Sequence, residues 1–79
     1  MITPNELKQR MEKQPFQPFR IHTTSGLVFD VTNHDMMFIK RHEVEIALDP
    51  DSEGFAVRCA TVPLLHVATV EDLSASKPL

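Results

Sequence analysis

Between residues 19 and 72, apolar and polar side chains alternate with a period of two, in short runs that end at turn-forming residues. Such alternation predicts β-strands, because successive side chains of a strand point to opposite faces of a sheet. The turns between the runs are short, so neighbouring runs are expected to pair as antiparallel hairpins. The register of each hairpin then follows from the requirement that apolar residues share one face.

The turn of the first hairpin determines its register. A three-residue loop over residues 24–26 pairs Ile21 with Phe29, whereas a two-residue loop would pair Ile21 with Asp30 and mix the two faces. The longer loop also ends in the glycine that a bulged three-residue turn requires at its left-handed position. On the outer face it sets Arg20 opposite Asp30, a favourable cross-strand pair. We therefore expect the three-residue loop.

The second hairpin is expected to turn at residues 41–42. Its register pairs Ile39 with Val44 on the inner face of the sheet. The same register sets Lys40 opposite Glu43 on the outer face, where opposite charges stabilise an antiparallel pair. The apolar and the charged positions therefore favour the same pairing.

The third hairpin is expected to pair Leu48 with Phe55 across an acidic turn. This register sets Glu45 opposite Arg58, which is again an opposite-charge pair. It also turns three residues toward the inner face: Phe55, Val57 and Cys59. Cys59 is then expected to be a small buried apolar residue rather than a reactive thiol.

The chain before the first strand carries a complete helix start signal. Thr3 is placed to cap the helix, Pro4 to occupy its first position and Glu6 to complete a capping box. Pro15 ends the helix, because the residue before a proline is disfavoured in the helical conformation. We expect a helix over about residues 3–14. A helix of this length is marginal in water, so it must dock on the strands through its narrow apolar stripe.

Near the end of the chain, Pro63 interrupts the last long strand, and residues 66–71 form a short closing strand. A short sheet that turns this often is expected to curl and close, which removes its exposed edges. We therefore predict one α+β, mostly β domain over residues 1–79, made of an N-terminal helix and a five-stranded antiparallel SH3-like or Sm-like small barrel. The barrel covers about residues 19–72, and residues 73–79 form a frayed tail.

A pattern rich in proline, phenylalanine and histidine runs through the chain. Its parts are Pro15-Phe16-Gln17-Pro18-Phe19-Arg20-Ile21-His22, then Ser25-Gly26, then Leu65-His66-Val67. In this pattern, which covers nearly the whole chain, the protein resembles a set of uncharacterised bacterial proteins of about this length. That set has no established activity, so the resemblance implies no function.

The order of one helix and bent strands is similar to that of Sm-like barrels, which include the bacterial Sm-like RNA chaperone. In those proteins a loop after the second strand carries an aspartate, and residues 34–39, which include Asp35, look similar. A Lys-His pair precedes their fifth strand; His66 matches its histidine, whereas Leu65 occupies the lysine position. The glycine usual in their bent second strand is also missing. The resemblance implies an RNA-binding oligomer, and both departures weaken that implication. SH3-like barrels share the short turn near Pro63.

The composition limits the classes of function. The chain has 8 Lys and Arg residues against 11 Asp and Glu residues, a net charge of −3, whereas nucleic-acid-binding domains usually carry a basic surplus. No apolar run approaches the ~20 residues of a membrane span, and the polar N-terminus shows no secretory signal. We therefore expect a cytoplasmic protein that binds neither membranes nor DNA.

Candidate catalytic and metal-binding residues form no recognisable motif. Both glycines are assigned to turns, so no glycine-rich phosphate loop is expected, and no serine, histidine and acid are arranged as nucleophile and base. The spacing of the possible metal ligands is unlike that of zinc sites: His22, His34, His42, His66 and Cys59. The turn from Asp49 to Gly54, with Asp51 and Glu53, resembles half of a calcium loop, but its twelfth position is Ala60 rather than a carboxylate. We expect no enzyme, no metal and no cofactor.

A candidate interface is formed by four residues: Met36, Phe38, Arg41 and His42. Met36 and Phe38, together with Val28, occupy outer-face positions where charged residues otherwise predominate, and Met and Phe are enriched in interface cores. The alternative is that they are scattered surface hydrophobic residues, which are common. Arg41, beside His42, is a cation without an expected carboxylate partner, which makes it the candidate RNA contact.

The sequence therefore predicts a non-enzymatic small-barrel interaction or regulatory module that binds a protein partner or a second copy of itself. The alternative is an Sm-like RNA-binding oligomer, and a small-ligand binder is a third hypothesis. The oligomeric state discriminates between the first two. A ring with Asn33, Arg41 and His42 on one rim would favour RNA binding, whereas burial of Met36 and Phe38 in a contact would favour protein binding.

Overall fold

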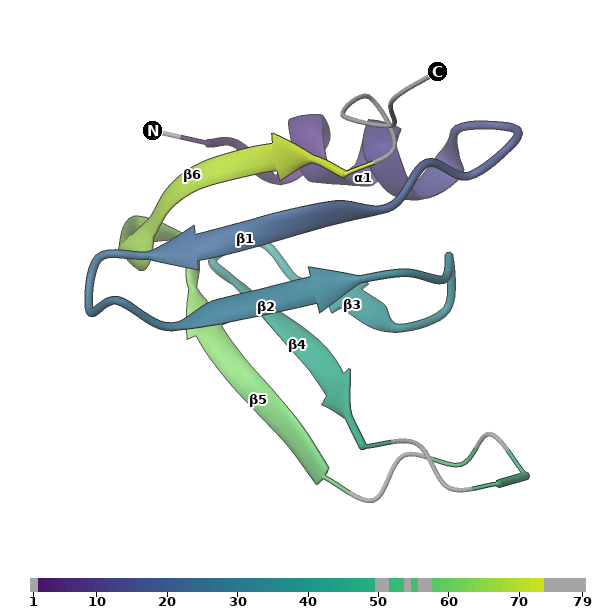
Figure 1. Ribbon diagram of the computed structural model, residues 1–79. Coiled ribbons are helices and arrows are strands. Elements are labelled where there is room, and N and C mark those ends of the chain that lie inside the picture. Colours follow the sequence, from purple (N-terminus) through teal and green to yellow (C-terminus); the bar gives the residue numbers. More distant parts are fainter. Residues whose placement is uncertain (1, 50–51, 54, 56–57, 74–79) are drawn as a thin grey trace.

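The structure, a computed structural model, describes residues 2–49, 52–53, 55 and 58–73. In these residues the chain forms one α-helix, one short 3₁₀ helix and six strands (Figure 1). In chain order they are α1 (Pro4–Glu12), β1 (Phe19–Thr23), β2 (Val28–Val31), β3 (Met37–Ile39), β4 (Glu43–Leu48), β5 (Arg58–Pro63), η1 (Leu64–His66) and β6 (Val67–Asp72).

The strands form two separate antiparallel sheets of three strands, in the orders β2-β1-β6 and β3-β4-β5. Figure 1 shows the first sheet, in blue and yellow-green, above the second, in teal and green. The expected five-stranded SH3-like or Sm-like barrel over residues 19–72 is therefore wrong. The described residues form six strands, and no ladder between them closes the two sheets into a barrel.

The reason lies between β2 and β3. A strand that belongs to both sheets of a small barrel must bend sharply, and such bends are usually made at a glycine or a bulge. β2 is only four residues long and contains no glycine. After Val31 the chain turns, with the amide of Met36 donating to the carbonyl of Asn33 at 3.3 Å. β2 therefore ends at Val31, and β3 pairs with β4, as predicted, without a ladder to β2.

The first hairpin has the predicted register. Ile21 pairs with Phe29, and Gly26 adopts the left-handed conformation at φ 88°. Arg20 lies opposite Asp30, and Arg20 Nε donates to Asp30 Oδ1 at 2.6 Å. This hydrogen bond lowers the pKa of Asp30 and raises that of Arg20. The second hairpin is also confirmed, since Ile39 pairs with Val44.

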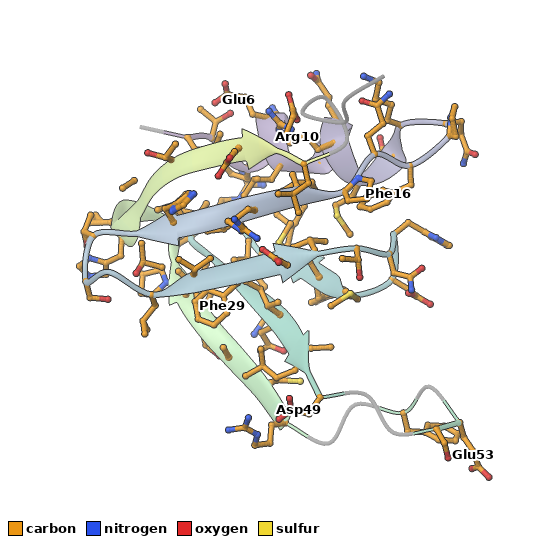
Figure 2. The ribbon with its side chains drawn as sticks, in the orientation of Figure 1. Glu6, Arg10, Phe16, Phe29, Asp49 and Glu53 are labelled. Atoms are coloured by element: carbon orange, nitrogen blue, oxygen red, sulfur yellow. The ribbon has the colours of Figure 1, made fainter. Side chains whose placement is uncertain are left out.

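The third hairpin differs from the prediction. Leu48 pairs with Arg58 rather than with Phe55, and Glu45 pairs with Thr61 rather than with Arg58. A shift by an odd number of residues exchanges the two faces of a strand. Cys59 is therefore exposed, and Val62 is buried instead. Arg58 forms its ion pair with Asp49. Asp49 directly follows β4 and has a left-handed backbone conformation at φ 49°. Figure 2 shows its side chain beside the start of β5.

The closing part of the chain has the predicted interruption at Pro63 and a closing strand, which covers Val67–Asp72 rather than residues 66–71 because a 3₁₀ helix that was not predicted includes His66. β5 ends at Pro63, η1 follows, and β6 pairs with β1. Of the predicted tail, Leu73 is described and donates its amide to the carbonyl of Pro18 at 3.0 Å. Residues 74–79 lie outside the described residues, and so does Val57 of the third hairpin.

The helix begins as predicted. Thr3 Oγ1 accepts from the amide of Glu6 at 3.2 Å, and the Glu6 carboxylate accepts from the amide of Thr3 at 2.8 Å. This capping box satisfies backbone donors that have no partner inside the helix. The helix ends at Glu12, before the expected end at residue 14.

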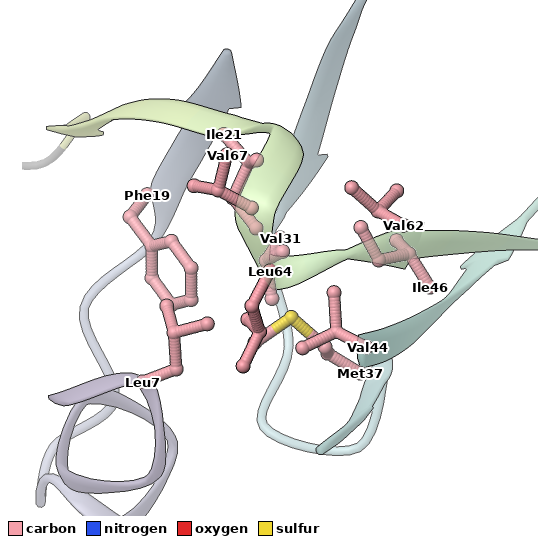
Figure 3. Packing of buried hydrophobic residues seen from close by; sticks show 10 residues of the cluster. All are labelled: Leu7, Phe19, Ile21, Val31, Met37, Val44, Ile46, Val62, Leu64 and Val67. Atoms are coloured by element: carbon pink, nitrogen blue, oxygen red, sulfur yellow. The ribbon is translucent and has the colours of Figure 1, made fainter. Parts of the chain in front are cut away.

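The apolar face of the helix joins a core shared by both sheets. Leu7 is fully buried and lies against Phe19 (Figure 3). The ring centroid of Phe16 lies 6.1 Å from that of Phe19. Arg10 forms an ion pair with Asp72 of β6, and its guanidinium lies over the ring of Phe19 in β1. The buried hydrophobic residues are Leu7, Phe19, Ile21, Val31, Met37, Val44, Ile46, Val62, Leu64 and Val67.

Candidate functional surfaces

The outer face of the second sheet carries the first two candidate residues. In β3, Met37 is buried, so the alternation of the strand turns Phe38 outward, where 66 % of it is exposed. Met36 is half-buried in the turn before β3, and its carbonyl accepts from the amide of Ala47 at 2.8 Å. Cys59 lies opposite Ala47 on β5. We call this surface, made by Met36, Phe38, Ala47 and Cys59, the Phe38 face.

The Phe38 face borders a hollow of about 480 Å³, to which His34 and Asp35 also contribute. The side chain of Met36 is fixed there, because its Sδ accepts from the amide of Thr32 at 3.4 Å and from the Thr32 hydroxyl at 3.2 Å. The Met36 side chain of the Phe38 face is thus held in place by hydrogen bonds. The Phe38 ring, by contrast, projects into solvent. An exposed aromatic ring beside a hollow is typical of surfaces that bind proteins.

Arg41 and His42 lie on a different surface. They form the exposed turn between β3 and β4 and line a hollow of about 550 Å³. Leu65 of η1, Pro4 at the start of α1 and Ile2, which precedes the helix, also line this hollow. The carbonyl of His42 accepts from the amide of Leu64 at 2.9 Å, which holds the turn against η1. We call this second surface the Arg41 hollow. The four predicted interface residues therefore belong to two surfaces whose hollows share no lining residue.

The charged side chains around these surfaces are mostly paired. Lys40 Nζ lies 2.8 Å from Glu45 and 3.4 Å from Glu43, and the hydrogen bond to Glu45 is the main cause of its raised pKa. Arg20 and Arg58 are also held by carboxylates. Among the residues that the structure describes, Arg41 forms no ion pair.

A third hollow was not predicted from the sequence. It measures about 610 Å³ and lies between the outer strands β2 and β5 of the two sheets. Phe29 and Val62 line it, and Leu27, which is 57 % exposed, stands at its rim. Figure 2 shows Phe29 on the side of β2 that faces β5. We call this hollow between β2 and β5 the inter-sheet groove. It could not be predicted together with a closed barrel, because in a barrel these two outer strands would pair.

The candidate metal ligands are dispersed. His22 bonds Glu71 at 2.9 Å, and His66 bonds the hydroxyl of Thr24 at 3.2 Å. Over residues 2–49, 52–53, 55 and 58–73, no three His, Cys, Asp or Glu side chains are grouped as metal ligands. In the turn that resembles half of a calcium loop, Asp49 forms an ion pair with Arg58, while Asp51 and Gly54 lie outside the described residues.

Comparisons with models of known protein families, with curated proteins and with solved structures found no match. In the described part of the chain, none of the helical segments has both the length and the apolar character needed to cross a membrane.

Proposed function

We propose that the protein is a non-enzymatic interaction module of the cytoplasm that binds a protein surface through the Phe38 face. The surface belongs either to another protein or to a second copy of this chain. The observation that carries the proposal is the 66 % exposure of Phe38 beside a hollow that is lined by Met36 and Cys59.

The proposal has an energetic basis. Phe38 is solvated in the isolated chain, so a partner that covers it removes a large apolar side chain from water. Full burial of such a side chain contributes about 1.5–3 kcal/mol. Residues of this kind anchor interfaces when they fit a complementary surface, whereas the surrounding contacts contribute less. Met36, with its flexible thioether, suits a contact that adapts to its partner.

The pairing of charges favours protein over RNA as the partner. Three cations of the strands and turns, Arg20, Lys40 and Arg58, already contact carboxylates. Phosphate binding requires cations that are available to replace counterions along the backbone. A surface with Arg41 as its free cation would bind RNA weakly and with a shallow dependence on salt.

The single cysteine of the chain provides the test. Cys59 is exposed on the Phe38 face, so a thiol-reactive benzophenone attached there reports what covers this face. After irradiation in a cell lysate, we expect the labelled protein to form a discrete adduct with a protein or with a second copy. We expect Phe38→Thr to abolish this adduct.

Two controls make the experiment specific. Val28→Thr makes an apolar side chain that is exposed on β2 polar, by replacing a methyl group with a hydroxyl, and it should leave the adduct intact. Moving the label to the solvent side of α1, with Cys59→Ser and Lys8→Cys, should remove the adduct. Adducts that disappear after nuclease treatment would instead identify RNA as the partner. The absence of any adduct that depends on Phe38 would contradict the proposal.

A further inference from the structure

The Arg41 hollow combines apolar walls with a free cation. Its apolar walls come from two separate segments of the chain: residues 2–4, which contribute Ile2 and Pro4, and residues 63–65, which contribute Pro63 and Leu65. Leu65 is 63 % exposed, whereas its neighbour Leu64 is buried in the core. The buried Leu64 fixes the backbone of η1, and Leu65 is thereby presented to solvent.

Two ionised side chains line this hollow, Arg41 and Glu43, and they differ in whether they have an ion-pair partner. The Glu43 carboxylate lies 3.4 Å from Lys40, which it shares with Glu45 at 2.8 Å. Arg41 has no carboxylate partner among the described residues, and it stands beside His42 on the exposed turn. The rim therefore offers a guanidinium whose donors are free to bind a ligand.

We infer that the Arg41 hollow binds an acidic, apolar peptide segment of another protein. An apolar side chain of that segment lies on Leu65, and a neighbouring carboxylate of the segment pairs with Arg41. Guanidinium groups bind carboxylates through two parallel hydrogen bonds, so the pairing selects acidic segments over neutral ones. The apolar walls select a leucine-like side chain over a polar one.

The net charge of −3 does not prevent this recognition. At physiological ionic strength, charges farther than about 8 Å from the bound carboxylate are largely screened, so the nearby Arg41 determines the local preference. For the same reason, binding should weaken when salt is added.

This inference is independent of the proposed function. The Phe38 face and the Arg41 hollow have no lining residue in common. A variant of Phe38 therefore tests the first surface, and variants of Arg41 or Leu65 test the second. Either proposal can fail while the other stands.

The test is a titration of the ¹⁵N-labelled full chain with capped peptides, followed by NMR. The probe is a five-residue peptide of alternating glutamate and leucine. Two matched peptides replace either every glutamate with lysine or every leucine with alanine. We expect the first peptide to shift the amide signals of residues 41–43 and 64–65, and we expect both matched peptides to bind at least tenfold more weakly.

Substitutions complete the test. Arg41→Gln should weaken binding of the glutamate–leucine peptide about tenfold, since a charge-assisted bidentate pair is lost. Leu65→Ser should weaken it severalfold. Lys13→Gln, which removes an exposed cation of a different surface, should leave the affinity unchanged, and each variant's spectrum verifies its fold.

Four results would overturn the inference. They are equal binding of the lysine peptide, full affinity of the Arg41→Gln variant, signal shifts confined to another surface, and no binding at millimolar peptide. Tighter, Arg41-dependent binding of a short uridine-rich RNA would assign the hollow to nucleic acid instead. Self-association that depends on Arg41 would assign it to a second copy of the chain.

Discussion

The surface chemistry of this protein is determined by which charged side chains satisfy one another. Arg20 and Lys40 have the carboxylate partners that their strand positions predicted. Arg58 also has a partner, but it is Asp49 instead of Glu45, because the register of the third hairpin differs. Arg41 remains available in the described structure, as the sequence suggested. At the scale of single residues, the ion-pair partner of a charged side chain could thus be predicted wherever the predicted strand register was correct.

The Arg20–Asp30 pair leads to a prediction about pH. The pKa of Asp30 is lowered in the folded protein by the hydrogen bond from Arg20. A lowered folded-state pKa adds stability above the unfolded-state pKa of about 4, and this stability is lost as the pH falls through the folded-state pKa. Asp30→Asn should therefore lower the Tm slightly at pH 7.

The difference in Tm between wild type and Asp30→Asn should shrink as the pH falls below about 4 and through the lowered folded-state pKa, where the wild-type carboxylate becomes protonated. Thermal unfolding followed by circular dichroism at several pH values measures this difference. An equal difference at pH 2.5 and pH 7 would mean that the charge of Asp30 contributes nothing to stability.

At the scale of elements, the sequence determined the hairpins that have short turns. In the first hairpin, the glycine at the left-handed position and the opposite-charge pair both predicted the same register. The third hairpin connects Leu48 and Arg58 through a longer acidic segment, and two apolar sets of opposite phase compete for the inner face. Phe55 and Cys59 form one set, and Ala60 and Val62 form the other. Charge pairing could not decide between them, because Arg58 finds an acid in either register.

The register of β5 predicts opposite responses at two neighbouring positions. Val62 is buried, so Val62→Ala should lower the free energy of unfolding by about 1–3 kcal/mol through lost burial and a cavity. Cys59 is exposed, so Cys59→Ser should change it by less than about 0.5 kcal/mol. Urea unfolding of the two variants measures both values. A larger loss of unfolding free energy for Cys59→Ser than for Val62→Ala would instead support the register in which Leu48 pairs with Phe55.

The docking of α1 is the other prediction at this scale. Leu7 is the fully buried residue of the helix, so Leu7→Ala should destabilise the protein by about 2–5 kcal/mol. Thr3→Ala removes the cap alone and should cost about 1 kcal/mol. A domain of this size is expected to have a total stability of about 4–12 kcal/mol, so the Leu7 variant should be close to unfolding at 37 °C. Thermal unfolding of both variants shows which substitution destabilises the protein more. An equal loss of stability in the two variants would indicate that the helix is not anchored by Leu7.

At the scale of the whole molecule, the sequence predicted the helix, the closing strand and most strand positions, but not the arrangement of the sheets. Local pairing depends on neighbouring residues, whereas closure of a barrel depends on whether distant strands such as β2 and β5 meet. They do not pair in the structure, and the inter-sheet groove lies between them. The same limit applies to the candidate interface, whose residues are close in sequence but line separate hollows.

The central claim is that Phe38 serves binding rather than folding. The most direct measurement compares wild type and Phe38→Thr in both respects, using the partner or second copy that is captured at Cys59. We predict that Phe38→Thr weakens the association at least tenfold and changes the free energy of unfolding by less than about 0.5 kcal/mol, as is usual for exposed side chains. Unchanged association would contradict the claim, and so would a loss of stability large enough to explain the weaker association.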